Sequence, residues 1–471
     1  MLTRRTLLEN LLKSSAALTF APGVLARAQA YSVFSIRLAH TEPTAVPANF
    51  TGLGYEMSSV ATPGLLRSAN HRYIELVRGL GPAGVMRVGG IVANYTRYIP
   101  NGTAHDDRQN TVINHAILEE FGAFLNQIGW STIWSVNLAQ GTIEQTIEEA
   151  RAVSNVLGSR LLALEIGNEV DSYGNGQPFR PPSYGYDAYR KEYGVWHDAI
   201  AKAVPGIRFA APDTTFRAAG WLERMAQDSK GDVQLLTTHY YRNGQKRGSA
   251  EQLLHPDPSL KIVAERLGAV SEQSGIPWRM CETNSFSGGG RPGVSDTFLG
   301  ALWTLDFMLL LAGCGCAGVN IETGVNQLGF VSSYSPIQDD GKGMNFAGAP
   351  YYGMLAFAQA FAGCDQMLPL ATGSPSQSLT TYVLGSGGKP RSVVIVNKDD
   401  ANDAQISVAE LGMEHASVLR LSAPAQDSTD GINFGGAKVD EAGRWKAESK
   451  ERLHDARVAV PRMSAVVLRA H

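Results

Sequence analysis

Short runs of apolar residues recur through the middle of the chain, separated by longer stretches with helical periodicity. Apolar runs of this length, bounded by turn residues, are typical of buried strands. The runs that predict strands are Leu53–Met57, Gly84–Val88, Thr132–Val136, Leu161–Ile166, Ile207–Ala211, Val233–Thr238, Trp278–Cys281 and Ala317–Ile321.

The stretches between these runs predict amphipathic helices. After the second strand, apolar side chains share one helical face, and Gly129 suits the cap that ends the helix. That face consists of Ile113, Ile117, Phe121, Phe124 and Ile128. A capping box at Thr142–Gln145 predicts the start of the next helix. Eight strand–helix units predict an α/β fold, a (β/α)8 TIM barrel over residues 49–359, whose active site lies at the C-terminal ends of the strands.

The pattern changes from about residue 360. Gly-Ser-Pro punctuation gives way to short alternating runs that predict an all-β sandwich domain over residues 360–471. These runs are Thr381–Leu384, Ser392–Val396, Ala416–Leu421 and Ser464–Leu468. Phe34, Ile36 and Leu38 also alternate. Residues 31–48 are therefore predicted to form a strand segment that joins the sandwich.

Residues 1–30 have the pattern of an export signal. Thr3–Leu8 contains a twin arginine, an apolar stretch follows at Leu11–Leu25, and Ala28–Ala30 offers small residues for cleavage before Tyr31. The apolar stretch is too short to span a bilayer. We therefore expect a bacterial protein that is exported to the periplasm or secreted; the alternative is a disordered cytoplasmic tail.

Charge and composition narrow the classes of function. The 41 basic and 44 acidic residues give a net charge of −3, which offers no electrostatic footprint for nucleic acid or an anionic membrane. No apolar run after residue 30 reaches membrane-spanning length. The chain lacks a His-Glu-x-x-His zinc motif, a Gly-x-Ser-x-Gly elbow and a phosphate loop. No acidic cluster requires a metal, so we expect neither a cofactor nor a metal ion.

Two glutamates carry the strongest chemical signal, because each follows a predicted barrel strand. Glu169 follows the fourth strand and Glu282 the seventh. A retaining glycosidase needs such a pair: one carboxylic acid protonates the leaving oxygen, and the other carboxylate attacks the anomeric carbon. Asn168 strengthens the signal, since its amide can bond a sugar hydroxyl next to the reacting carbon. We expect the two carboxyl groups to lie about 5–5.5 Å apart.

In their order along the chain, these motifs resemble family 79 of the glycoside hydrolases. That family includes bacterial β-glucuronidases and has mammalian heparanase as a distant relative. The likeness runs from about residue 31 to the end of the chain. The matching residues are Gly167–Glu169, His239–Gly244, Glu282–Ser285, Gly288–Gly290, Val294–Phe298 and Tyr334–Ile337.

The resemblance implies roles for individual residues. Glu169 would be the acid/base and Glu282 the nucleophile. Tyr241 would hydrogen-bond the nucleophile, and His239 would line the same pocket.

The resemblance also implies that the loop after the nucleophile binds the sugar carboxylate through the backbone N–H groups of Gly288 and Gly289. Glycines let a backbone approach a ligand closely, and successive N–H groups can form an anion nest. The chain departs from the family at Ser287, where members usually carry a tyrosine, and at Val170, where proline is common. The hydroxyl of Ser287 is a shorter donor, so we expect weaker selection of the carboxylate.

Two further candidates have alternative interpretations. Glu56, at the end of the first strand, would bind a sugar hydroxyl or form a salt bridge within the barrel. Tyr334 would line the site or belong to an ordinary Tyr-Ser-Pro turn.

The sequence thus predicts a secreted, retaining exo-β-glucuronidase whose partner is a glycoside substrate. The first alternative is a retaining β-glycosidase of the same clan that acts on a 4-O-methyl glucuronide, a glucoside or a xyloside. The second is a carbohydrate-binding protein without catalysis. The natural aglycone and the oligomeric state are left open by the sequence.

Overall fold

The computed structural model describes residues 33–324, 332–371 and 373–470. The chain from Val33 onward forms one compact unit. The export signal expected at residues 1–30 and the cleavage point before Tyr31 lie outside the described residues. No helix within the described ranges is long and apolar enough to cross a bilayer.

Eight parallel strands close into a barrel and follow one another around it in sequence order. They are β3 (Thr51–Glu56), β4 (Val85–Gly89), β7 (Ser131–Val136), β8 (Leu161–Ile166), β9 (Phe209–Thr214), β10 (Leu235–Gly244), β11 (Trp278–Ser287) and β12 (Val319–Glu322). The predicted TIM barrel is confirmed. β9, β10 and β11 extend beyond the apolar runs that predicted them, because their last residues are polar.

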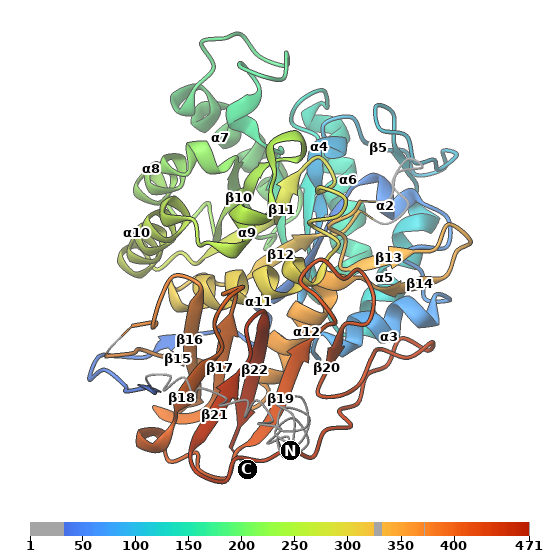
Figure 1. The fold of residues 1–471 in the computed structure, drawn as a ribbon. Coiled ribbons are helices and arrows are strands. Elements are labelled where there is room, and N and C mark those ends of the chain that lie inside the picture. Colours follow the sequence, from blue (N-terminus) through green and yellow to red (C-terminus); the bar gives the residue numbers. More distant parts are fainter. Residues whose placement is uncertain (1–32, 325–331, 372, 471) are drawn as a thin grey trace, which may run out of the picture. The chain divides into compact units, whose positions relative to one another are not determined.

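Helices surround the barrel, with one principal helix after each strand (Figure 1). These helices are α3 (His71–Gly79), α5 (His115–Ile128), α6 (Ile143–Leu157), α7 (Tyr186–Ala203), α8 (Gly220–Asp228), α10 (Pro258–Ser274), α11 (Phe298–Gly313) and α12 (Ala349–Phe361). Shorter helical segments are α2 (Ser58–Ala61), α4 (Gly90–Ala93), α9 (Ala250–Leu254), η1 (Gly158–Arg160), η2 (Val170–Ser172), η3 (Phe216–Ala218), η4 (Gln245–Arg247) and η5 (Ala409–Leu411). Two predicted caps are confirmed: Gly129 ends α5 with a φ of 80°, and Thr142 begins α6 with a capping box.

The interior of the barrel is layered. Its lower layer is a small apolar cluster formed by Val85, Ile133, Ala163, Ala210, Leu235 and Cys281. Side chains two positions apart on a strand share a face. The next inward positions on three of these strands are therefore Arg87, Ser135 and Glu165, all of which are buried. A buried polar layer thus lies between the apolar layer and the C-terminal ends of the strands.

Two further sheets lie outside the barrel. One has seven strands in the order β2 (Thr44–Ala45), β15 (Gln366–Leu368), β16 (Leu379–Ser386), β17 (Lys389–Asn397), β22 (Ser464–Arg469), β19 (Ser417–Ser422) and β20 (Asn433–Phe434). The other has three strands, β1 (Phe34–Ser35), β18 (Ala404–Ser407) and β21 (Arg457–Val460). The N-terminal strands β1 and β2 pair with β18 and β15, so both pair with strands beyond residue 360. Two short pairs complete the sheets, β5 (Arg97–Tyr98) with β6 (Val112–Ile113) and β13 (Ile337–Asp339) with β14 (Asn345–Ala347).

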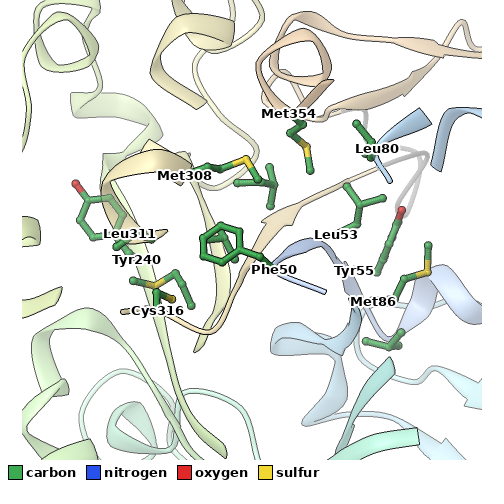
Figure 2. Packing of buried hydrophobic residues seen from close by; sticks show 14 of the residues in the cluster. Phe50, Leu53, Tyr55, Leu80, Met86, Tyr240, Met308, Leu311, Cys316 and Met354 are labelled. Atoms are coloured by element: carbon green, nitrogen blue, oxygen red, sulfur yellow. The ribbon is translucent and has the colours of Figure 1, made fainter. Parts of the chain in front are cut away.

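The seven-stranded sheet packs against α11 and α12 (Figure 1). Strand and helix side chains from the barrel and side chains from β16, β17 and β22 belong to one continuous apolar cluster. Figure 2 shows part of this cluster, including Leu53 and Tyr55 from β3 and Met308 and Leu311 from α11. The barrel and the large sheet therefore share a core.

Candidate active site

A cavity of about 1120 Å³ opens at the C-terminal ends of the barrel strands. Every candidate residue from the sequence lines it: Glu56, Asn168, Glu169, His239, Tyr241, Glu282, Ser287, Gly288, Gly289 and Tyr334. Its lining residues all fall between Glu56 and Tyr334, so the cavity belongs to the barrel.

A β-bulge places Glu282 in the cavity. The register between β10 and β11 shifts so that Thr238 pairs with Met280 and His239 with Glu282. A bulge re-aims side chains by adding one residue to a strand. Cys281 thus joins the apolar layer while the next residue, Glu282, also reaches the interior. The prediction that the seventh strand ends at Cys281 is wrong, because the apolar run ends there but the strand continues to Ser287.

Glu169 lies in a tight turn between β8 and η2. Its φ of 48° and ψ of 50° are left-handed, which is uncommon for a residue other than glycine. Gly167 has a φ of 96°, and a Cβ there would lie 2.6 Å from Cγ1 of Val170. The turn therefore requires glycine at 167, and it brings Asn168 and Glu169 to the cavity wall.

The two glutamates face each other across the cavity. A carboxylate oxygen of Glu169 and one of Glu282 lie within 4.8 Å. Glu282 Oε2 accepts a hydrogen bond from Arg87 Nη1 at 2.8 Å, and its Oε1 accepts one from the hydroxyl of Tyr241 at 2.9 Å. Glu169 has one longer contact, 3.3 Å from its Oε1 to Nδ1 of His239, and its side chain is 26% exposed against 14% for Glu282. Two donors thus fix the carboxylate of Glu282 in place, whereas Glu169 is more open to water.

His239 is oriented by a carboxylate that the sequence did not single out. Nε2 of His239 donates to Asp213 Oδ1 at 2.7 Å, which turns Nδ1 toward Glu169. Burial alone would lower the pKa of His239, but the Asp213 and Glu282 carboxylates outweigh it and raise this pKa well above its ordinary value. Its surroundings therefore favour the protonated form of His239, which contacts Glu169.

Arg87 connects most of the polar groups below the cavity, and sequence reasoning missed it. In addition to Glu282, it donates to Glu165 Oε2 at 3.0 Å, Asn168 Oδ1 at 2.7 Å and Asp213 Oδ2 at 2.6 Å. Burial would lower its pKa, but the surrounding carboxylates raise it, so the guanidinium stays charged. Burial and Asp213 raise the pKa of Glu165 to about 7, against the opposing charge of Arg87. The available signal was a lone arginine within the apolar run Gly84–Val88.

Two more carboxyl groups line the cavity, Glu56 at the end of β3 and Glu322 at the end of β12. Glu56 forms no ion pair with a described residue; instead its Oε2 accepts the backbone N–H of Val92 at 2.8 Å. Burial, and next the charge of Glu282, raise the pKa of Glu56 to about 8. The same two causes raise the pKa of Glu322 well above its ordinary value. Both groups are therefore harder to ionise than an exposed glutamate.

Gly288 and Gly289, in the loop after β11, line the cavity. Gly288 and Gly289 have φ values of 81° and 92°, and neither N–H has an acceptor among the described residues. Gly289 O accepts hydrogen bonds from Ser333 Oγ and the Tyr334 N–H, which fixes the loop against the segment that carries Tyr334. The Tyr334 ring also stacks on Tyr241, 6.3 Å between centroids.

Glu169, His239 and Glu282 lie close enough together to hold one cation. Their surroundings do not fit a metal site, however. The carboxylate of Glu282 already binds the guanidinium of Arg87, and the raised pKa of His239 opposes loss of the ring proton that a metal ion would have to displace.

Comparisons with known proteins find relatives and similar folds among glycosidases. No family model matches the chain. The chain is 26% identical over 322 residues to a β-glucuronidase of Neurospora crassa, a match that covers 59% of this chain and 56% of that protein. It is 25% identical over 328 residues to a β-glucuronidase of Aspergillus niger, covering 61% of this chain and 59% of that protein. The chain thus spans less than two thirds of the length of these relatives.

Solved structures share the fold over 93% of this chain at low sequence identity. A 4-O-α-L-rhamnosyl-β-D-glucuronidase from Fusarium oxysporum 12S has a TM-score of 0.77 at 15% identity, and all of that chain is covered. A family 51 α-L-arabinofuranosidase from Bifidobacterium longum has a TM-score of 0.68 at 14% identity, with 99% of that chain covered. A β-xylosidase from Caulobacter crescentus CB15 has a TM-score of 0.61 at 14% identity, again with 99% covered. These likenesses establish the TIM barrel with flanking β-sheets.

Proposed function

We propose that the protein is a retaining glycoside hydrolase that acts on β-glucuronides. The observation that carries the proposal is the pair of carboxylate oxygens, one on Glu169 and one on Glu282, within 4.8 Å of each other at the C-terminal end of a TIM barrel. Retaining glycosidases hold their two carboxyl groups about 5–5.5 Å apart, whereas inverting ones leave about 6.5–9.5 Å for a water molecule.

In the first step, Glu282 attacks the anomeric carbon while Glu169 protonates the leaving oxygen. The exocyclic carbon–oxygen bond breaks, the aglycone leaves as an alcohol, and a glycosyl ester forms on Glu282. Tyr241 and Arg87 support this assignment of the nucleophile, because their hydrogen bonds hold the Glu282 carboxylate in a fixed orientation.

In the second step, Glu169 acts as the base. It takes a proton from a water molecule, which attacks the anomeric carbon and releases Glu282 as a carboxylate. The greater exposure of Glu169 supports this role, since its partner water must arrive from solvent.

The glycone proposed for this site is a uronic acid. The N–H groups of Gly288 and Gly289 have no acceptor among the described residues, and they can donate to a C6 carboxylate. Asn168 would bond the C2 hydroxyl, next to the anomeric carbon. The two fungal relatives are β-glucuronidases, which supports the same class of substrate.

A 4-O-substituted glucuronide is the second candidate. Ser287 stands where related enzymes carry a tyrosine, and its smaller side chain leaves more room beside the glycone. The Fusarium enzyme with the same fold acts on a glucuronide substituted at this oxygen. The proposed chemistry at Glu169 and Glu282 is the same for both candidates.

A panel of 4-nitrophenyl β-glycosides tests the proposal directly. We expect hydrolysis of the β-glucuronide to exceed that of the β-glucoside and β-xyloside, with retention visible by NMR of the first-formed sugar. Faster hydrolysis of the glucoside would overturn the uronide specificity, and an inverted product would overturn the double displacement.

Variants of the two glutamates test their roles. Glu282→Ala should lose all turnover, whereas Glu169→Ala should still form the glycosyl ester from a nitrophenyl substrate, because nitrophenolate needs little protonation to leave. Azide should then restore turnover to Glu169→Ala and yield a β-glycosyl azide. Rescue of Glu282→Ala to an α-glycosyl azide would show that the two roles are reversed.

A further inference from the structure

Glu322 is a buried carboxyl group on the cavity wall that the reaction above does not use. Its residue is 3% exposed, it lines the cavity, and its side chain makes no hydrogen bond or ion pair with a described residue. Buried polar groups are nearly always hydrogen-bonded, because leaving one without a partner destabilises the folded protein. Its Oε2 is the enclosed atom without a partner, but the residue also lines the cavity, so a molecule that enters the cavity can supply a partner for the carboxyl group.

The surrounding backbone accommodates this side chain. Gly54, on the neighbouring strand β3, pairs with Glu322 in the barrel register. A Cβ at Gly54 would collide with Glu322 Oε2. Asn284 Nδ2 donates to the backbone oxygens of Glu322 at 2.9 Å and of Tyr334 at 3.1 Å, which fixes the end of β12 beside the cavity. The carboxyl group of Glu322 thus fills space that the absence of a side chain at Gly54 leaves free.

The order of strands around the barrel indicates which part of a sugar Glu322 faces. Asn168, after β8, is assigned to the C2 side of the glycone, and Gly288, after β11, to its C6 carboxylate. The remaining edge of a pyranose ring carries the C3 and C4 hydroxyls. Strands β12 and β3 close the barrel between β11 and β4, and their ends carry Glu322 and Glu56.

We propose that Glu322 is a substrate-binding residue whose carboxyl group hydrogen-bonds the C3 or C4 hydroxyl of the glycone. The inference rests on the proposed function, because it uses the same placement of the sugar. The raised pKa of Glu322 supports it: a neutral acid has a proton to donate and does not repel a uronate.

The test combines two variants with substrates that lack one hydroxyl. Glu322→Met removes all hydrogen bonding at similar volume, and Glu322→Gln keeps a neutral donor. Each is assayed for kcat/KM on 4-nitrophenyl β-D-glucuronide and its 3-deoxy and 4-deoxy analogues. The Kd of the matching methyl glycosides is measured by calorimetry.

We expect native protein to discriminate against one deoxy analogue by roughly tenfold, the size of one hydrogen bond to a neutral group. Glu322→Met should lose this discrimination by weakening on the parent substrate and on the analogue that keeps the contacted hydroxyl, while the other analogue is unaffected. Glu322→Gln should retain most of the discrimination. The melting temperature of Glu322→Met should be equal to or above that of native protein, since the variant removes an unpartnered buried polar group. If Glu322 were purely structural, Glu322→Met would lower the melting temperature and leave the discrimination between substrates unchanged.

Glu149→Gln is the matched control, because Glu149 is also a buried acid with a raised pKa but lies on α6, away from the cavity. It should leave the discrimination unchanged. An equal loss on all three substrates in Glu322→Met, or no loss on any, would overturn the inference. Absence of turnover in native protein with the expected pattern of Kd values would instead refute the proposed hydrolysis and uphold the contact.

Discussion

At the scale of single residues, Arg87 determines the charge of the candidate site. Its guanidinium lies below the cavity and donates to Glu165, Asn168, Asp213 and Glu282. A planar group with five donors can bind several acceptors in fixed directions, which a lysine ammonium on a flexible chain cannot. Arg87 therefore aims Asn168 and Glu282 together.

Arg87→Lys should lower kcat/KM on a β-glucuronide by about 100-fold or more, since at least two charge-assisted hydrogen bonds of roughly 1.5–3 kcal/mol each are lost. The control is Arg279→Lys, because Arg279 is equally buried in the barrel but bonds Asn320 and backbone oxygens outside the cavity. Steady-state kinetics should show the large loss only for Arg87→Lys. Comparable losses in both variants would indicate a general effect on the barrel.

The buried acid Glu149 leads to a separate prediction, about how the stability of the protein depends on pH. Burial raises its pKa to about 7, partly opposed by the hydrogen bond from Trp134 Nε1. A raised pKa in the folded state means that the stabilising contribution of neutral Glu149 is complete below about pH 4.5 and is lost as pH rises through 7. Glu149→Gln should therefore be more stable than native protein at pH 8, by up to the order of 3 kcal/mol, and similar at pH 4.5.

Thermal melts of native protein and Glu149→Gln between pH 4.5 and 8 measure this difference. Glu148→Gln is the control, since Glu148 is the exposed neighbour on the same helix. A difference between native protein and Glu149→Gln that stays constant over this range would contradict the assignment.

The candidate site illustrates what single residues reveal in a sequence. Glu169 and Asn168 were predictable, because they directly follow an apolar run that ends in a turn with glycine. Asp213 and Glu322 were not predicted, since each is an ordinary polar residue near the end of a strand until the closed barrel turns it inward. The direction in which a side chain points depends on the register of its strand with the neighbouring strands, and a single sequence does not specify that register.

At the scale of elements, strand β11 also shows that the sequence pattern alone does not specify which way a side chain points. Strict alternation along this strand would place Cys281 and Glu282 on opposite faces. The bulge opposite Thr238 brings both to the interior. The eight strands and helices α5 and α6 follow from apolar periodicity, and the caps at Gly129 and Thr142 follow from cap residues, whereas the bulge has no counterpart in these patterns.

Helix α11 carries a prediction about the contact between the barrel and the large sheet. It is apolar on all sides except for Thr304 and Asp306, and Asp306 forms a 2.7 Å ion pair with the buried Lys398. Asp306 also accepts hydrogen bonds from Thr380 and Tyr382 on β16. Lys398→Met should reduce the free energy of unfolding by about 3–5 kcal/mol, because it leaves a buried carboxylate without its cation.

Chemical denaturation measures this loss, and the double variant Asp306→Leu with Lys398→Met should recover much of it. Lys261→Met is the control, since the pair between Lys261 and Glu265 is exposed and contributes about 0–1 kcal/mol. If Lys398→Met and Lys261→Met had equally small effects, the ion pair would not stabilise the contact.

At the scale of the whole molecule, the fold class was predictable because two periodicities occupy different parts of the chain. Strand–helix alternation ends near α12, and short alternating strands follow it. The shared core was harder to foresee. Apolar residues of β17 and β22, such as Val394, Val396 and Val467, belong to the same cluster as Phe307 and Phe357 on the barrel helices. Nothing in the local pattern states which helix a sheet will cover.

This shared core predicts how the isolated barrel behaves. Residues 49–361 contain every lining residue of the cavity, so the proposed chemistry does not itself require the sheets. Removal of the large sheet would nevertheless expose apolar faces of α11 and α12 and leave Asp306 without Lys398. We therefore expect residues 49–361 to aggregate or to bind a hydrophobic dye, as measured by size-exclusion chromatography and dye fluorescence, because large exposed apolar patches promote association.

The control is residues 33–471, which keep the compact unit complete and should be monodisperse under the same conditions. A monodisperse barrel that unfolds cooperatively at the temperature of the control would show that the sheet contributes nothing to the stability of the barrel.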